Sequence, residues 1–278
     1  MKKSNSKSKA QSAFWKLGAV ALITATIFFT ACKQTSGGGG GGKQGAPFVE
    51  GGASLILSPD NLTINVGAKT ADGSAITVEG CKETTLASEA ETTLTATGTT
   101  VILKGNITGL ECSSEYSNMG SLTALNVQGL TALQMLDCQG NRLTSLNVQG
   151  LTALQELYCG GNQLPELNVQ GLTALQELYC GGNKLTELNV QGLTALKNLW
   201  CFVNQFNAQA MTKLLKALPA REVDDRAYAI LYTEETGKVE GNCKDYTQPA
   251  DLKAAFDGAK SRNWRLWKIN ASGYDKDI

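Results

Sequence analysis

One pattern of apolar and polar residues recurs between Leu122 and Phe206 with a period of 21 residues. Each phrase reads Leu-x-x-Leu-x-Cys-x-x-Asn-x-Leu and continues Leu-x-Val-x-x-Leu; the cysteines that mark it are Cys138, Cys159, Cys180 and Cys201. A leucine and a cysteine at alternate positions predict one short strand with a single buried face. We therefore expect one such strand in each phrase, and equivalent strands side by side in a sheet.

The asparagine of each phrase predicts a turn directly after the strand. The four asparagines are Asn141, Asn162, Asn183 and Asn204. A buried amide must hydrogen-bond with nearby backbone, which the neighbouring phrase supplies, so we expect these residues to stack in a ladder. The pattern is that of a leucine-rich repeat. It predicts an α/β fold in which a solenoid over residues 106–206 has a parallel sheet on one side and a second line of leucines and valines on the other.

The segment before the repeats has a different pattern. Residues 52–105 contain short alternating runs of apolar residues and threonine, separated by glycines, and these predict strands. We interpret the segment as a β-rich N-terminal cap, because an uncapped first repeat would expose its leucines. Cys112 lies 26 residues before Cys138, so an insertion around Ser114 to Gly120 should bulge from the turn.

After Phe206 the period ends and residues 207–278 predict a C-terminal cap. Asn207 can cap a helix that runs to Leu218, and residues 250–260 predict a second amphipathic helix. Residues 227–232 and 264–269 predict strands. This αβαβ order is what an extension of the same parallel sheet requires.

The first 51 residues predict a targeting segment and a tether. Five lysines precede an apolar run over residues 17–30 that is too short to span a bilayer stably. The run ends Phe29-Thr30-Ala31-Cys32, which resembles the lipobox of bacterial lipoproteins and implies a signal peptide over residues 1–31 and lipidation at Cys32. The alternative is an ordinary secreted protein with an incidental cysteine. Residues 32–51 include six consecutive glycines and predict a flexible tether.

Together, the lipobox, the tether, the repeats and the tryptophan-containing last strand resemble the leucine-rich-repeat surface lipoproteins of treponemes. The resemblance covers nearly the whole chain. It implies a lipid-anchored protein of the cell surface or outer membrane that attaches to host proteins, host cells or other bacteria. Lys33, where an aspartate would imply inner-membrane retention, also favours the outer membrane.

Composition argues against catalysis and against nucleic-acid binding. The chain contains no histidine, which removes the commonest general base and the commonest zinc ligand. It has no phosphate-binding loop and no nucleophile elbow, so we expect no enzyme activity, no catalytic residues, no metal and no cofactor. Removing residues 1–31 takes away five of 25 basic residues and none of the 25 acidic ones, which leaves a net charge near −5.

The repeat cysteines are expected one strand apart, about 4.8 Å, with side chains pointing the same way. We interpret them as buried thiols that fill the core, with disulfides or a metal thread as the alternative. Whether Cys81 and Cys243 pair stays open.

Residues between the core positions should lie on the concave face of the sheet. There the sequence places aromatic residues beside acids, a composition typical of protein-binding surfaces. The candidate binding residues are Asp137, Glu156, Tyr158, Glu177, Tyr179, Asn198, Trp200 and Phe202. The alternative is that the aromatic rings only stabilise neighbouring strands. On the opposite face, the recurring Asn-Val-Gln-Gly is interpreted as a solvated spacer.

Two functions are compatible with these features. The first is an adhesin or interaction module that binds a protein, such as one of the host extracellular matrix or of another bacterial surface; the alternative ligand for this module is a carbohydrate. The second is a structural lipoprotein that organises the envelope through a partner in the same cell.

Overall fold

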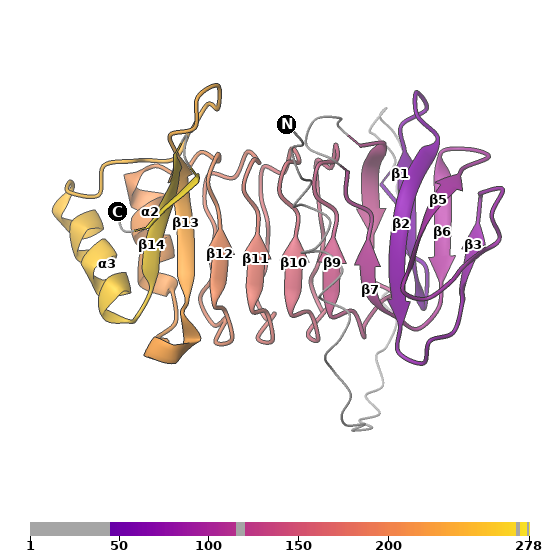
Figure 1. Cartoon of the computed structure of the whole chain (residues 1–278), viewed down its shortest axis with the longest axis horizontal. Helices are drawn as coiled ribbons and strands as arrows, with labels where there is room; N and C mark the ends of the chain where they lie inside the picture. The colour runs from indigo at the N-terminus through magenta and orange to yellow at the C-terminus, as the bar shows by residue number, and fades with distance from the viewer. Residues whose placement is uncertain (1–44, 115–119, 271–272, 277) are drawn as a thin grey trace, which may run out of the picture. The chain divides into compact units, whose positions relative to one another are not determined.

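The computed structural model describes residues 45–114, 120–270, 273–276 and 278. The expected signal peptide, Cys32, most of the tether and most of the expected insertion lie outside these residues. Four equivalent strands pair in parallel and in register, as Figure 1 shows: β9 (Met135–Asp137), β10 (Glu156–Tyr158), β11 (Glu177–Tyr179) and β12 (Asn198–Trp200). Leu136, Leu157, Leu178 and Leu199 occupy one register position and are fully buried. The strand predicted for each phrase is thereby confirmed.

The asparagine ladder is also present. Asn162 donates from Nδ2 to the carbonyls of Cys138 in the preceding repeat (3.0 Å) and Cys159 in its own (3.1 Å). Its Oδ1 accepts from the Leu143 amide at 3.0 Å. Asn141, Asn183 and Asn204 make equivalent bonds. One buried amide thus joins each pair of adjacent repeats at three backbone points.

The ladder continues one step beyond the repeats. Asn242 donates to the carbonyls of Cys201 (2.9 Å) and Leu231 (2.8 Å), and accepts from the Phe206 amide (3.0 Å). It therefore takes the position of the next repeat's asparagine, although no repeat phrase surrounds it.

Glu240 closes the backbone ladder at the same end. The amides of Gly161 and Gly182 donate to carbonyls of the following repeat, but Val203 has no such carbonyl and donates instead to the Glu240 carboxylate at 2.9 Å. The same carboxylate accepts from Thr233 (2.7 Å) and Asn242 (2.9 Å). A single side chain thereby satisfies three amides where the repeats end.

Val203 departs from the repeat in its backbone conformation. The equivalent residues Gly140, Gly161 and Gly182 have φ of 67°, 66° and 69°, and Val203 adopts φ of 52°. Glycine reaches this left-handed region without steric penalty, whereas a β-branched residue is strained there. The last repeat therefore carries a strained turn that its neighbours avoid.

Replacing Val203 by glycine should raise the free energy of unfolding by about 1 kcal/mol, because relief of a left-handed conformation outweighs the added freedom of the unfolded chain. Gly182→Val should do the opposite, since a Cβ there would also lie 3.2 Å from the Gly161 nitrogen. Thermal unfolding of both variants measures the difference. A lower melting temperature for Val203→Gly would show that the valine side chain contributes more by packing than its backbone loses.

The cysteines of the repeats are buried and free. Cys112, Cys138, Cys159, Cys180 and Cys201 have at most 1% of their surface exposed and form no disulfide. Burial raises the pKa of each of these thiols, so the neutral form is held in the core. Cys81 and Cys243 are partly buried and also free, so they do not pair with each other.

The N-terminal strands form two sheets around the first repeat. They are β1 (Gly52–Leu57), β2 (Thr63–Thr70), β3 (Ile76–Glu79), β4 (Thr85–Leu86), β5 (Ala90–Thr95), β6 (Thr100–Lys104), β7 (Ile107–Glu111) and β8 (Leu122–Asn126). β7 pairs with β9 in parallel, and β2 and β5 continue that sheet in antiparallel fashion. The other strands form a five-stranded sheet in the order β4-β3-β6-β1-β8. Both sheets contribute side chains to one apolar core.

The C-terminal segment follows the predicted order of elements. It contains α2 (Ala208–Ala217), η2 (Val223–Asp225), β13 (Tyr228–Thr233), α3 (Ala250–Ser261), β14 (Arg265–Asn270) and β15 (Gly273–Lys276). Asn207 caps α2, accepting from the Ala210 amide at 2.9 Å. β13 and β14 extend the sheet in parallel, and the unpredicted β15 pairs with β14 antiparallel. Neither helix in the described residues has the length and apolarity needed to cross a membrane.

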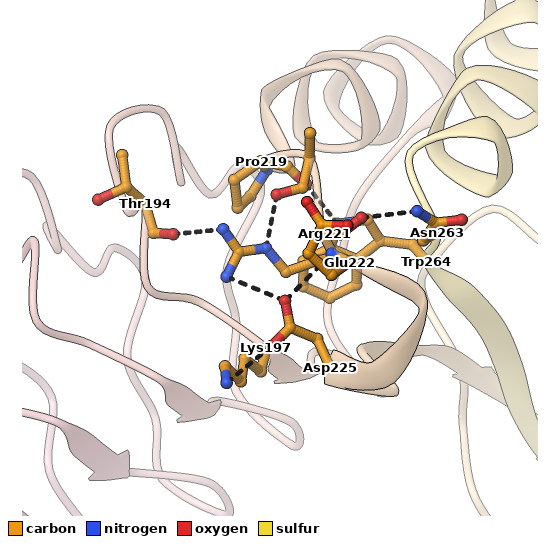
Figure 2. A network of polar contacts seen from close by, with 9 residues as sticks. Thr194, Lys197, Pro219, Arg221, Glu222, Asp225, Asn263 and Trp264 are labelled. Carbon is orange, nitrogen blue, oxygen red and sulfur yellow. Dashed lines mark hydrogen bonds and ion pairs between the residues drawn. The ribbon is translucent and has the colours of Figure 1, made fainter.

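A polar network joins the last repeat to this segment (Figure 2). Asp225 accepts from Lys197 of the last repeat at 2.8 Å and from the Glu222 amide at 3.1 Å. Arg221 donates to the Thr194 carbonyl at 2.5 Å. Two hydrogen bonds from residues that follow α3 complete the network: Asn263 donates to the Arg221 carbonyl, and Trp264 Nε1 donates to the Pro219 carbonyl. The loop between α2 and β13 is thereby held from both sides.

Candidate functional site

The first and third residues of each repeat strand form one face of the sheet. Because the middle leucine points into the core, its two neighbours point the other way, and each is partly exposed. We call this set, with its register equivalents on β7, β13 and β14, the outer face of the parallel sheet. It brings together seven of the eight predicted binding residues: Asp137, Glu156, Tyr158, Glu177, Tyr179, Asn198 and Trp200.

Aromatic rings form a continuous row across the outer face. Tyr158 meets Tyr179 edge-on with ring centroids 4.6 Å apart, and Tyr179 stacks on Trp200 at 4.1 Å with an interplanar angle of 8°. The repeat spacing places one ring per strand at the same register position, so each ring lies directly against the next. Neighbouring rings cover part of each surface, which leaves the row half-buried rather than fully exposed.

The row extends further than the sequence analysis indicated. Tyr228 on β13 lies 6.4 Å from Trp200, and it stacks on Trp267 of β14 at 4.7 Å. Ile230, in register between Trp200 and Trp267, is 1% exposed. The signal that could have identified the two extra rings is the register of the predicted strands, which places Tyr228 opposite Asn198 and Trp267 opposite Ile230.

Phe202, the eighth predicted residue, lies two positions beyond Trp200. A Cβ atom at Gly181 in the preceding repeat would lie 3.1 Å from Cε1 of the Phe202 ring and 3.0 Å from the Phe202 carbonyl oxygen. The absence of a side chain at Gly181 therefore gives the Phe202 ring its space.

Carboxylates border the row at its first tyrosine. The Tyr158 hydroxyl lies 2.9 Å from Glu156 Oε2 and 2.8 Å from Glu177 Oε2. Asn198 donates to the other oxygen of Glu177 at 3.1 Å. Burial raises the pKa of Glu156, and the neighbouring Glu177 adds to the rise. A phenol has one proton to donate, so the two acids compete for it and one retains hydrogen-bonding capacity for a ligand.

The acidic side of the face continues through β9 to β7. Burial raises the pKa of Asp137 to about 6, although the Gln139 amide and side chain both donate to its Oδ1, at 3.0 Å and 3.3 Å. Burial also raises the pKa of Glu111, and Glu91 contributes to the rise. The outer face therefore carries carboxyl groups without aromatic rings on β7 and β9, both carboxyl groups and aromatic rings on β10 and β11, and aromatic rings on β12 to β14.

The outer face combines aromatic and acidic groups. Within the described residues, no three histidine, cysteine, aspartate or glutamate side chains are grouped to hold a metal ion. What the face offers is flat aromatic surface for stacking and carboxylates for hydrogen bonds and ion pairs.

The raised pKa of Asp137 predicts a pH-dependent effect of neutralising it. The folded state binds the proton of the Asp137 carboxyl group more tightly than the unfolded chain does. Protonation of Asp137 therefore stabilises the folded state fully below about pH 4, and this stabilisation is lost as the pH rises through about 6. Asp137→Asn keeps an acceptor for Gln139 without the buried charge, so it should stabilise the protein at pH 7.5, by on the order of 1 kcal/mol, and change little at pH 4.

Melting curves of wild type and Asp137→Asn at the two pH values test this expectation. Asp224→Asn, at an exposed aspartate in η2, controls for the loss of one negative charge. A variant that is no more stable than wild type at pH 7.5 would show that solvent or a neighbouring group already compensates the carboxylate.

The comparisons with solved structures found leucine-rich-repeat proteins, whereas neither a protein-family model nor a curated protein matches this chain. The functional domain of InlJ from Listeria monocytogenes, described as including a cysteine ladder, is 31% identical over 45% of this chain and 25% of its own, with a TM-score of 0.37. A leucine-rich-repeat protein of Leptospira interrogans is 23% identical over 51% of this chain and 33% of its own (TM-score 0.34). An internalin of Listeria monocytogenes is 17% identical over 59% and 47% (TM-score 0.36).

This chain thus spans between a quarter and just under half of the length of those structures. The in-register strands and the asparagine ladder identify its central segment as leucine-rich repeats.

Proposed function

We propose that the protein is a non-catalytic binding protein that recognises a protein ligand through the outer face of its parallel sheet. The observation that carries this proposal is the continuous row of five rings from Tyr158 to Trp267, bordered by the carboxylates of Glu156 and Glu177. Aromatic residues with polar groups at their edge dominate the energetics of protein interfaces. The row also spans several strands, so its extent suits another macromolecule better than a small molecule.

A purely structural role for the rings makes a different prediction. Stacked aromatic pairs stabilise neighbouring strands by up to about 1 kcal/mol each, whether or not they bind anything. The two roles are compatible in one residue, but only a binding role couples the rings to a partner. Measuring affinity and stability on the same variants separates them.

Tyr179→Ala and Trp200→Ala should each weaken binding by about 2 kcal/mol or more, because truncating a central anchor leaves its pocket on the partner unfilled. The partner is first recovered by affinity capture with residues 45–278 and then titrated against each variant, with thermal melts alongside. Thr173→Ala, at an exposed turn outside the face, is the matched control. Glu156→Gln should mainly change the association rate and its salt dependence.

The outcome of these titrations decides between the two roles. Normal affinity with lowered melting temperatures in both aromatic variants would make the row structural. Loss of binding in Thr173→Ala but not in Trp200→Ala would place the ligand elsewhere on the repeats.

We further propose that a lipid anchor at Cys32 holds the protein at the outer membrane or cell surface, where it acts as an adhesin for host proteins, host cells or other bacteria. The basic and apolar start of the chain, Ala31-Cys32 and the glycine tether support this placement. The alternative is an envelope-organising lipoprotein with a partner in the same cell. Protease added to intact cells should remove an outward-facing adhesin and spare a protein that faces the periplasm.

Lipidation at Cys32 predicts that wild-type protein incorporates a fatty-acid analogue supplied to cells, and that Cys32→Ala does not. The variant should also leave the membrane fraction, because its tether would have no acyl chains to partition into lipid. Cys81→Ala serves as the control for loss of a thiol. Label on the Cys32→Ala protein would refute this site of attachment.

A further inference from the structure

A groove runs along the repeats on the side opposite the aromatic row. Its volume is about 1280 Å³, and it extends from Gly45 and Ala46 at one end to Lys213 and Lys216 of α2 at the other. Its floor contains one leucine from each repeat, and these leucines are slightly exposed: Leu125 7%, Leu146 8%, Leu167 7% and Leu188 4%. One rim is a row of asparagines, Asn126, Asn147, Asn168 and Asn189.

A local hydrogen bond sets the orientation of each rim asparagine. The side-chain oxygen of Asn147 accepts from the Gln149 amide at 3.0 Å, and Asn126, Asn168 and Asn189 accept from the equivalent glutamines at 3.0 to 3.1 Å. With the oxygen fixed in this way, the amide nitrogen must point away from the turn. The four donors therefore share one orientation, at intervals of one repeat.

Glutamine side chains hold the rim in place. Gln149 donates from Nε2 to the Asn168 carbonyl at 3.1 Å, and Gln170 donates to the Asn189 carbonyl at 2.8 Å. These bonds link each repeat to the next on the rim itself. The asparagine donors are thus presented by a fixed frame, although the same residues were interpreted from the sequence as solvated spacers.

The first rim asparagine already holds a stretch of backbone. Asn126 donates from Nδ2 to the carbonyl of Ala46 at 3.1 Å, and Ser54 donates to the carbonyl of the next residue, Pro47. The equivalent nitrogens of Asn147, Asn168 and Asn189 make no hydrogen bond with any described residue. Three donors with the same orientation as Asn126 therefore face the groove without a protein acceptor.

We propose that this groove is a second binding site, which takes an extended segment of a partner polypeptide by donating hydrogen bonds from Asn147, Asn168 and Asn189 to its backbone carbonyls. The Ala46 contact supports a polypeptide, because the chain itself shows a backbone carbonyl on the first equivalent donor. Glu166 and Glu187 line the groove together with Lys213 and Lys216, so no single charge sign selects the ligand. Among the residues that the structure describes, none that lines the groove has an aromatic side chain to stack on a sugar ring. The slightly exposed leucines would contact apolar side chains of the segment.

The test uses the full-length protein and a capped, fluorescent synthetic peptide that copies residues 45–50, the segment that includes the Ala46 carbonyl. The variant is Asn147→Asp combined with Asn168→Asp, which keeps the oxygens that accept from Gln149 and Gln170, replaces each donor nitrogen by an acceptor oxygen and adds two negative charges. Thr152→Asp with Thr173→Asp adds the same charge at exposed positions of the same two repeats. Fluorescence anisotropy gives the affinities, and thermal melts verify folding.

We expect saturable binding to wild type, unchanged binding to the threonine variant, and at least about tenfold weaker binding to the asparagine variant, as the loss of two hydrogen bonds implies. Tyr179→Ala should bind the peptide as wild type does, which keeps this result independent of the aromatic row. Absence of saturable binding to wild type, or equal weakening in both double variants, would overturn the proposal. Displacement of the peptide by a soluble oligosaccharide such as cellohexaose would also overturn it, in favour of a carbohydrate site.

Discussion

The buried asparagine amide is the interaction on which the repeats depend. At each step it satisfies backbone carbonyls from two successive repeats and a backbone amide, in a position where water could not replace it. The three-residue strands are too short to hold the stack alone. Burial of the leucines stabilises the stack but does not fix the position of one repeat relative to the next. The asparagine amide fixes that position, because its hydrogen-bond geometry determines how far one repeat is displaced from the next. That displacement sets the register of the outer face and of the groove on the other side.

Both candidate sites follow from this fixed displacement. On the outer face it places Tyr158, Tyr179 and Trp200 at equivalent positions of successive strands, so that each ring lies against the next, edge-on for the first pair and stacked for the second. On the opposite side it places the rim asparagines in a row of donors. One face therefore presents aromatic surface and the other presents polar donors. Each repeat adds one residue to each of these two rows.

Much of this could be predicted from the sequence, because the repeat is a local pattern. The strands, the ladder of Asn141 to Asn204 and the helices of the C-terminal segment each follow from spacing within one phrase or one amphipathic run. Asn242 and Glu240 could not be found in this way, since no phrase surrounds them and their roles arise only when β13 lies beside β12. The same is true of Tyr228 and Trp267, which join the row through strand register rather than through sequence distance. The pairing of β8 with β1 was missed because nothing in the Leu122 segment distinguishes it from the equivalent, strandless segments of later repeats.

Asn242 and Glu240 have a further consequence for how the molecule can change in length. In the C-terminal segment, Asn242 takes the place of the asparagine of one more repeat, and Glu240 takes the place of its carbonyl. The segment therefore contacts only the last repeat, and its contacts do not depend on how many repeats precede it. The phrases containing Cys159 and Cys180 have almost the same sequence, and each offers the same surface to its neighbour. A duplication or deletion of one 21-residue phrase would therefore leave both ends correctly seated. Recombination between near-identical phrases can therefore lengthen or shorten both candidate surfaces by whole repeats without a new folding problem to solve.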